Sequence, residues 1–489
     1  MNSSDICDEK QDITDNCDEK QDITDNCDEK QDITDNCDDK QDITDNCDEK
    51  QDITDNCDEK QDITDNCDEK QDITDDCDEK KDITEDRNEN KHIINECDQE
   101  MAREKINKLL KETVKTLNTF KYDLKIQEVS SGGANYTSNL YKVQVIPESG
   151  KEELKLFVKI ACPSVNFRNT LKEWKIYTTE EFFYTKLLTT FKTIEDLNKV
   201  RGHHKLVFCK YYGCNSVVYE EMLVLEDLTA NNWMVYDRFK PITWPYAKAA
   251  VTELAKFHSL SFAFSEKEPV EFKEVLERLK TQMNDESMSS FVKSSTSVAL
   301  QSVKQENQER LKKYFEDFET KVKQASEPIG RSVIGHGDFR PSNLMHKIKE
   351  DGTVDIRIVD LQTLQGACPV ADLLYFIFTG SDEEFRSLYY DRLVDHYYTE
   401  LEAALIRLHL DPEKVYSRAD FDFEIKEKLP YGLTVAVFAL PVVTVSVENA
   451  PKIDEDMELA AFTTDKASDM YVERLNGVVD DFVKWGLFE

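Results

Sequence analysis

The stretch VIGHGDFRPSN at residues 333–343, followed by IRIVDLQ at 356–362, decides what fold and chemistry we expect of this chain. The first segment carries Asp338 and, five residues later, Asn343, and the second places Asp360 at the end of an apolar run. Phosphoryl transfer from ATP needs one carboxylate that faces the acceptor hydroxyl. It also needs an amide oxygen and a second carboxylate that hold Mg²⁺ against the phosphates. The pattern therefore predicts a phosphotransferase site, and a turn in which the Asp and Asn only cap the backbone is the alternative.

A lysine upstream fits the same chemistry. Lys159 lies in the apolar run LKLFVKI at 154–160, where an unpaired ammonium group is costly to bury. An ion pair with a glutamate and with a phosphate would offset that cost, and the helix expected at about 169–190 offers Glu180 and Glu181. A lysine strand, a glutamate helix, the HGD loop and the VDLQ strand thus follow one another in the order that strengthens the phosphotransferase prediction.

The pattern over residues 101–489 predicts a β-rich part followed by a helical part. Strands are expected within 125–150 on both sides of Gly132 and Gly133, where the backbone can approach phosphates. A helix is expected before them at 101–120, and further strands at 154–160, 205–213 and 217–228. Later helices are expected at 244–262, 267–281, 298–325, 371–410, 422–440 and 462–486. We therefore expect an α+β fold with two lobes, residues 101–228 and 229–489, and a cleft between them.

The first hundred residues form a separate segment. From Cys7 to about Asp86 the unit CDEKQDITDN repeats every ten residues, and each unit has one Ile and one Cys among mostly polar residues. This is too little apolar area to offset the entropy cost of ordering the chain. The segment also lacks the order of an EF-hand and the close cysteine pairs of a zinc site. Residues 1–100 are predicted to be a disordered acidic tail, with weak Ca²⁺ or Zn²⁺ capture as the alternative.

Most of the acidic charge belongs to that tail. Residues 1–100 hold 39 Asp and Glu against 11 Lys and Arg, a balance of −28, so that −10 of the total of −38 remains for the other 389 residues. Such a balance argues against binding of nucleic acid, whose phosphates are negative.

Two further stretches bear on location. The N-terminus MNSSDIC lacks the basic and apolar regions of a secretory signal. The most apolar stretch, 432–447, is too short for a bilayer span and contains Pro441, so we expect a buried helix there. These features predict a cytoplasmic protein with reduced cysteines that binds no membrane, and they leave the oligomeric state open.

Other polar residues have simple structural explanations. The four residues His203, His204, Cys209 and Cys214 could suggest zinc, but Cys209 lies in an apolar run, where a buried core cysteine is favoured. The spacing of His258 favours a packed or capping histidine over a catalytic one. Asp372 is expected to anchor the HGD loop by hydrogen bonds. The aromatic-rich stretch 372–398 is expected to be helix core, in part lining an apolar acceptor pocket.

Over about residues 120–489 the chain resembles the ecdysteroid-kinase-like family, relatives of choline kinases and aminoglycoside phosphotransferases. The resemblance rests on SGGANYTSNLYKV, FVKIACPS, the E-x-x-F-Y of Glu180–Tyr184, LVLEDL (223–228), LAKFHSLS (254–261), HGDFRPSNLM (336–345), VDLQ (359–362) and PVADLLYFIF (369–378). It implies a protein-kinase-like fold with a β-rich N-lobe and a helical C-lobe. It also implies transfer of the ATP γ-phosphate to a small-molecule hydroxyl, with an ecdysteroid or another lipophilic or xenobiotic alcohol as the leading acceptor class.

The resemblance also implies roles for the HGD loop. Asp338 resembles the catalytic base, and Asn343 and Asp360 resemble the magnesium ligands. The family commonly has Trp two residues after this Asp and Asn before the metal-binding Asn, whereas this chain has Arg340 and Ser342. Neither position holds the metal or the proton, so the chemistry should survive. For Arg340, an internal salt bridge on the loop is favoured over contact with an anionic or polar acceptor.

In the N-lobe the resemblance makes Lys159 the phosphate-binding lysine and Glu180 its partner. It makes the segment from Glu226 to Leu228 the linker whose backbone meets adenine. Two hypotheses of other classes stay open: a catalytically inactive kinase-fold binding protein, and an acidic tail that acts as an interaction arm. The intact lysine, carboxylates and amide argue against the first, and protein acceptors are disfavoured because the chain lacks a D-F-G and A-P-E pair.

Overall fold

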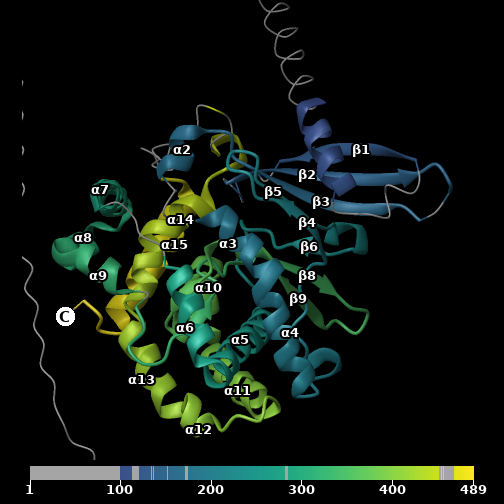
Figure 1. The fold of residues 1–489 in the computed structure, drawn as a ribbon. Coiled ribbons are helices and arrows are strands. Elements are labelled where there is room, and N and C mark those ends of the chain that lie inside the picture. The colour runs from purple at the N-terminus through teal and green to yellow at the C-terminus, as the bar shows by residue number, and fades with distance from the viewer. Residues whose placement is uncertain are drawn as a thin grey trace, which may run out of the picture. The chain divides into compact units, whose positions relative to one another are not determined.

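The computed structural model describes residues 100–112, 121–130, 132–133, 135, 137–150, 152–170, 175–280, 285–325, 327–450, 453, 455 and 467–488. All of them lie in one compact unit, Asp78–Glu489. The predictions of a disordered tail over residues 1–100, and of metal capture by it, concern residues that are almost entirely outside this description. Within it, an antiparallel sheet is followed by a mainly helical region (Figure 1), which confirms the predicted α+β, two-lobed kinase-like fold.

Five strands form the sheet of the N-lobe in the order β1-β2-β3-β5-β4. They are β1 (Tyr122–Val129), β2 (Ser138–Pro147), β3 (Leu154–Ala161), β4 (Tyr211–Asn215) and β5 (Met222–Glu226). Side chains alternate along a strand, so one face of the sheet carries Val145, Leu156 and Val224, all fully buried. The helix at residues 100–112 covers this face with Ile106 and Leu110.

The strand predicted at 205–213 was partly wrong, because β4 begins only at Tyr211. The preceding residues belong to the core of the helical lobe instead, where Leu206 and Phe208 are buried. The backbone N–H of Leu206 donates to the Glu195 carboxylate at 2.7 Å rather than to a neighbouring strand. Leu206 and Phe208 therefore pack against the helical lobe instead of pairing in the sheet, because tertiary packing outweighs their strand propensity.

The helix predicted at 169–190 is divided. The structure has α2 (Val165–Thr170), α3 (Ile176–Phe182), a π-helical turn (Phe183–Leu187) and α4 (Leu188–Leu197), with residues 171–174 outside the description. Turns of π-helix occur often beside functional sites. Here the turn directly follows the helix that carries Glu180.

The helical lobe is built around α5 (Trp244–Lys267), in which Phe257, Phe262 and Phe264 are fully buried. The other helices are α6 (Pro269–Arg278), α7 (Asp285–Ser302), α8 (Gln308–Tyr314), α9 (Phe318–Ala325), α10 (Pro369–Gly380), α11 (Glu383–Arg407), α12 (Pro412–Val415), α13 (Arg418–Lys428), α14 (Tyr431–Thr444) and α15 (Asp469–Lys484). Three long predicted helices are thus each broken by short turns.

The break between α10 and α11 is marked by a glycine and a capping aspartate. Gly380 ends α10 so close to Pro341 that a Cβ there would lie 2.8 Å from the proline ring. Asp382 then caps α11 by accepting a hydrogen bond from the N–H of Phe385 at 2.7 Å. The apolar stretch with Pro441 forms the largely buried helix α14, as predicted. In the described part of the chain, no helix is both long and apolar enough to cross a membrane.

Short strands at the junction of the lobes carry the polar loops. The strands β8 (Leu344–Ile348) and β9 (Val354–Ile358) form a hairpin, which β6 (Met234–Val235) extends. The strands β7 (Val333–Gly335) and β10 (Gln365–Ala367) form a separate pair. The HGD loop leaves β7 and enters β8, so both pairs fix its ends.

Candidate active site

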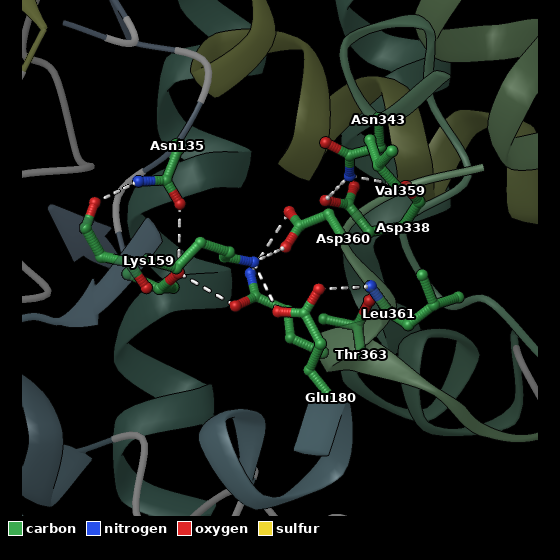
Figure 2. A network of polar contacts seen from close by, with 12 residues as sticks. Asn135, Lys159, Glu180, Asp338, Asn343, Val359, Asp360, Leu361 and Thr363 are labelled. Atoms are coloured by element: carbon green, nitrogen blue, oxygen red, sulfur yellow. Dashed lines mark hydrogen bonds and ion pairs between the residues drawn. The ribbon is translucent and has the colours of Figure 1, made fainter. Parts of the chain in front are cut away.

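The β8–β9 hairpin brings the two predicted metal ligands to one end. Leu344 pairs with Ile358, and the N–H of Val359 donates to the carbonyl oxygen of Asn343 at 3.0 Å. Asn343 directly precedes β8 and Asp360 closely follows β9, so they are neighbours in space. Figure 2 shows them beside Asp338, with side chains of the N-lobe approaching from the other side.

The orientation of Asn343 fits a magnesium site. Its Nδ2 donates to the carbonyl oxygen of Asp338 at 3.0 Å and to Asp338 Oδ2 at 2.8 Å, which directs its Oδ1 away from that carboxylate. An amide oxygen and the Asp360 carboxylate are oxygen ligands, which Mg²⁺ prefers, and phosphate and water usually supply the remaining ligands. No group of three His, Cys, Asp or Glu side chains in the described ranges is arranged to hold a metal. The fit therefore depends on the pair Asn343 and Asp360.

The backbone of Asp360 is unusual. Its φ of 66° and ψ of 58° lie in the left-handed region, which residues other than glycine seldom adopt. The residue leads into a short 3₁₀ turn, Leu361–Thr363. Such conformations persist where the surrounding structure holds them and are frequent at functional sites.

Lys159 on β3 forms a buried ion-pair cluster with carboxylates from both lobes. Its Nζ lies 2.5 Å from Glu180 Oε2 on α3 and 2.6 Å from Asp360 Oδ1. Glu180 also accepts a hydrogen bond from the N–H of Leu361 at 3.3 Å through its Oε1. The predicted helix offered two glutamates, and the structure brings Glu180 rather than Glu181 to the lysine (Figure 2).

The cluster changes the acidity of its members. Burial by itself would lower the pKa of Lys159, but the charges of Asp360 and Glu180 raise it above its ordinary value. Burial raises the pKa of Glu180. Burial also opposes ionisation of Asp360, yet the charge of Lys159 holds the pKa of this carboxyl below its ordinary value. The Lys159–Asp360 pair is therefore ionised at neutral pH.

Asp372 on α10 anchors the HGD loop by hydrogen bonds to the loop backbone. Its Oδ2 accepts hydrogen bonds from the N–H of His336 at 2.6 Å and from His258 Nε2 at 3.1 Å, and its Oδ1 accepts from the N–H of Gly337 at 2.9 Å. His258 is fully buried and its Nδ1 contacts the Tyr397 hydroxyl at 2.6 Å. These contacts agree with the anchoring role predicted for Asp372 and the packed histidine predicted at 258.

Gly337 is the tightest point of the loop, and we expect Gly337→Ala to be far more disruptive than a matched glycine substitution. Its φ is +79°, and a Cβ would lie 2.2 Å from the carbonyl oxygen of Thr363. Gly352 has a φ of +81° but no atom within 4 Å of its Cβ position. Both changes incur backbone strain of about 1 kcal/mol, and only Gly337→Ala adds a clash with backbone. Urea unfolding should show Gly337→Ala less stable than Gly352→Ala by at least about 2 kcal/mol; equal stabilities would contradict the close approach.

Arg340 forms the internal salt bridge that the sequence favoured. Its Nε lies 3.0 Å from both Oδ1 and Oδ2 of Asp338, and its Nη1 donates to Ser342 Oγ at 3.2 Å. The residue is 7% exposed. Arg340 thus contacts both the expected base, Asp338, and the hydroxyl of Ser342.

Several contacts that bear on the site had no sequence signal. Thr137 Oγ1, next to β2, donates to Gln362 Oε1 at 3.0 Å and so joins the lobes. Arg238 Nη2 donates to the carbonyl oxygen of Gly132 at 2.6 Å. Burial and the nearby Asp338 carboxylate raise the pKa of Tyr375 well above its ordinary value, which places this member of the aromatic stretch beside the expected base.

The remaining predicted residues lie at turns and strand ends of the N-lobe sheet. Gly132 and Gly133 form a turn between β1 and β2, with φ values of +55° and +89° that suit glycine. Glu226 ends β5, and Leu228 begins the 3₁₀ turn Leu228–Asn231. Their proposed contacts with phosphate and adenine stay predictions.

Comparison with known proteins gives one strong match. The ecdysteroid kinase-like family matches residues 132–410, more than half of the chain. No curated protein matches.

Among solved structures, the chain is similar to an ethanolamine kinase from Plasmodium vivax, at 12% identity over 73% of this chain and 81% of that chain, with a TM-score of 0.37. It is also similar to a GDP complex of aminoglycoside 2'-phosphotransferase-IIIa, at 10% identity over 78% and 98% of the two chains, with a TM-score of 0.37. A glucosamine kinase matches at 11% identity over 66% and 88%, with a TM-score of 0.27. Because these TM-scores lie below 0.5, we draw the family assignment from the family match and not from the solved structures.

Proposed function

Since this chain belongs to the ecdysteroid kinase-like family, we propose that it transfers the γ-phosphate of ATP to a hydroxyl group of a small molecule. The observation that carries the proposal is the meeting of Asp338, Asn343, Asp360 and Lys159 at one place. These residues come from segments as much as 201 positions apart. A base, two oxygen ligands for a metal and a phosphate-binding cation are the groups that phosphoryl transfer needs.

Each residue has a definite task in the proposed reaction. Lys159 binds phosphate oxygens, and Glu180 holds the lysine in place by their 2.5 Å ion pair. Asn343 Oδ1 and the Asp360 carboxylate would hold Mg²⁺, which neutralises charge on the phosphates. The acceptor oxygen bonds to the γ-phosphorus, the bond from that phosphorus to the β-phosphate oxygen breaks, and ADP leaves. The hydroxyl proton passes to the Asp338 carboxylate.

The acceptor we propose is an ecdysteroid or another lipophilic alcohol. The guanidinium of Arg340 is engaged by Asp338, so it is not the natural partner of an anionic acceptor group. This engagement favours an uncharged acceptor group, and the family match is what points to a lipophilic alcohol.

A thermal-shift titration of the full chain with Mg²⁺ and ATP tests the nucleotide site. Ligand at 100 times its Kd should add about 2.7 kcal/mol to stability, which raises Tm by a few degrees. Asp360→Ala should lose the Mg²⁺-dependent part of this shift. Asp355→Ala is the matched control, because Asp355 lies on the adjoining strand β9 but pairs with Lys349 at the surface.

The outcomes separate the candidate functions. No shift in the wild-type chain would contradict the kinase proposal at its base. A shift without any ADP formation, with or without an ecdysteroid present, would favour the hypothesis of a kinase-fold binding protein. A shift that survives Asp360→Ala would remove that residue from the metal site.

A further inference from the structure

Arg340 contacts both oxygens of the expected base. Its Nε lies 3.0 Å from Asp338 Oδ1 and 3.0 Å from Oδ2, while Asn343 Nδ2 reaches Oδ2 from another side at 2.8 Å. The carboxylate is therefore held from two directions and has little freedom to rotate. Asn343 is neutral and its Oδ1 is a proposed metal ligand. Arg340 is the charged side chain that contacts Asp338 in the described part of the chain.

The guanidinium group is itself held. Its Nη1 donates to Ser342 Oγ at 3.2 Å, and the Arg340 side chain is 8% exposed. A planar guanidinium fixed in this way bonds a carboxylate with a defined direction, which the flexible ammonium of lysine does not. The loop thus contains a rigid support for Asp338, composed of Arg340 and Ser342.

The charges of the site show why such a support matters. Lys159 is the cation paired with Glu180 and Asp360, and Arg340 is the cation paired with Asp338. Without Arg340, the Asp338 carboxylate would stand unpaired where the negative γ-phosphate must approach. Repulsion would then push the carboxylate away from the line of attack.

We propose that Arg340 is a positioning residue for the transfer step, which holds the Asp338 carboxylate in the orientation that receives the proton of the acceptor hydroxyl. The inference rests on the proposed phosphotransferase function and adds a residue to its machinery. No bond to Arg340 forms or breaks, because the proton passes from the acceptor oxygen to Asp338 as the phosphoryl group leaves ADP. In the proposed reaction Arg340 acts through its contact with Asp338.

The test compares full-length wild type with Arg340→Met, Arg340→Lys and Ser342→Ala. Initial rates of ADP formation are measured with Mg·ATP, with ecdysone as the probe acceptor and with water as the only acceptor. Arg340→Met should lower kcat by about 10- to 100-fold, the loss expected when a catalytic group is misplaced by about 1 Å. KM for ATP should stay within about twofold, because Arg340 does not bind nucleotide in this scheme. Arg340→Lys should recover part of kcat, and Ser342→Ala should lose about two- to fivefold.

A double-mutant cycle separates positioning from mere support of the loop. If Arg340 acts through Asp338, then Arg340→Met should have no further effect on the residual rate of Asp338→Asn. Full additivity of the two losses would overturn the proposal. The proposal would also be overturned if the kcat of Arg340→Lys were no higher than that of Arg340→Met. A loss of Mg·ATP affinity as large as the loss of kcat would overturn it too.

Failure of this inference differs from failure of the proposed function. An active wild type whose Arg340→Met keeps full kcat would overturn the role of Arg340 and leave the phosphotransferase intact. A wild type that forms no ADP in either assay would overturn both.

Discussion

Asp338→Asn is expected to lower the turnover number for ADP formation by about 10³-fold and to leave the affinity for Mg·ATP nearly unchanged. A positioned general base contributes about 10²- to 10⁴-fold, and an amide cannot accept the proton of the acceptor hydroxyl. The new side chain keeps the size of the old one, and its oxygen can still accept from Arg340 or Asn343. The fold should therefore persist, so the loss is one of chemistry and not of structure.

Two measurements check this expectation. Steady-state rates with Mg·ATP and ecdysone give kcat, and thermal shifts with Mg·ATP give binding. Asp355→Asn serves as the control, because this carboxylate lies on β9, the strand that leads to Asp360, but pairs with the surface residue Lys349. A kcat within tenfold of wild type would show that Asp338 is not the base, and a parallel loss of Mg·ATP binding would assign it to the nucleotide site instead.

Lys159→Met should destabilise the folded chain by about 3 to 5 kcal/mol, the range for removal of one partner from a buried ion pair. Lys159 and Glu180 are 8% and 4% exposed, and Asp360 shares the same ammonium group. Methionine fills the space of the lysine stem but leaves two carboxylates without a cation. The same change removes the proposed phosphate ligand, so the thermal shift with Mg·ATP should disappear as well.

Urea unfolding of the two proteins measures this loss, and Lys155→Met is the matched control. Lys155 lies on the same strand, β3, but is exposed, so its replacement should change stability by less than about 0.5 kcal/mol. A Lys159→Met variant as stable as this control would mean that the ion-pair cluster makes no net contribution to the free energy of unfolding.

The pH dependence of this difference has a definite sign. The pKa of Lys159 is raised from 10.5, so its contribution to stability is complete below that pH and is lost as the pH rises above it. The pKa of Asp360 is lowered from 3.8, so its contribution is present above that pH and is lost as the pH falls below it. The stability gap between wild type and Lys159→Met should therefore be widest between these limits and narrow as the pH falls below 3.8 and Asp360 becomes protonated. A gap that stays constant on acidification would contradict the ion-pair explanation.

Local spacing made part of the site predictable. Asp338 and Asn343 are five residues apart on one loop, and such short separations leave few geometries for the chain. Likewise, the apolar alternation around Lys159 predicted β3, because the period of a strand depends only on neighbouring residues. The fold class and the family pattern could be read at this level.

Other expectations failed where tertiary packing decides. The run at 205–210 has strand-like composition, yet Leu206 packs into the helical core and bonds to Glu195. The contact with Glu195 has no signal in the residues next to Leu206. The single helix expected at 371–410 is two helices, and here Gly380 and the capping residue Asp382 are local signals of the break that the prediction missed.

The sequence by itself determined which chemical groups the chain carries and in what order: a lysine on a strand, glutamates on a helix, the HGD loop and a final aspartate. Only the tertiary structure decided which distant groups meet. It joined Lys159 to Asp360 across 201 positions and Thr137 to Gln362 across 225. The pairing of Lys159 with Glu180 and the salt bridge of Arg340 within its own loop were already expected from the sequence. The physical reason is the distance along the chain over which each kind of interaction acts. Backbone periodicity and turns are set by a few adjacent residues, whereas buried charges must find partners wherever packing of the lobes brings them together.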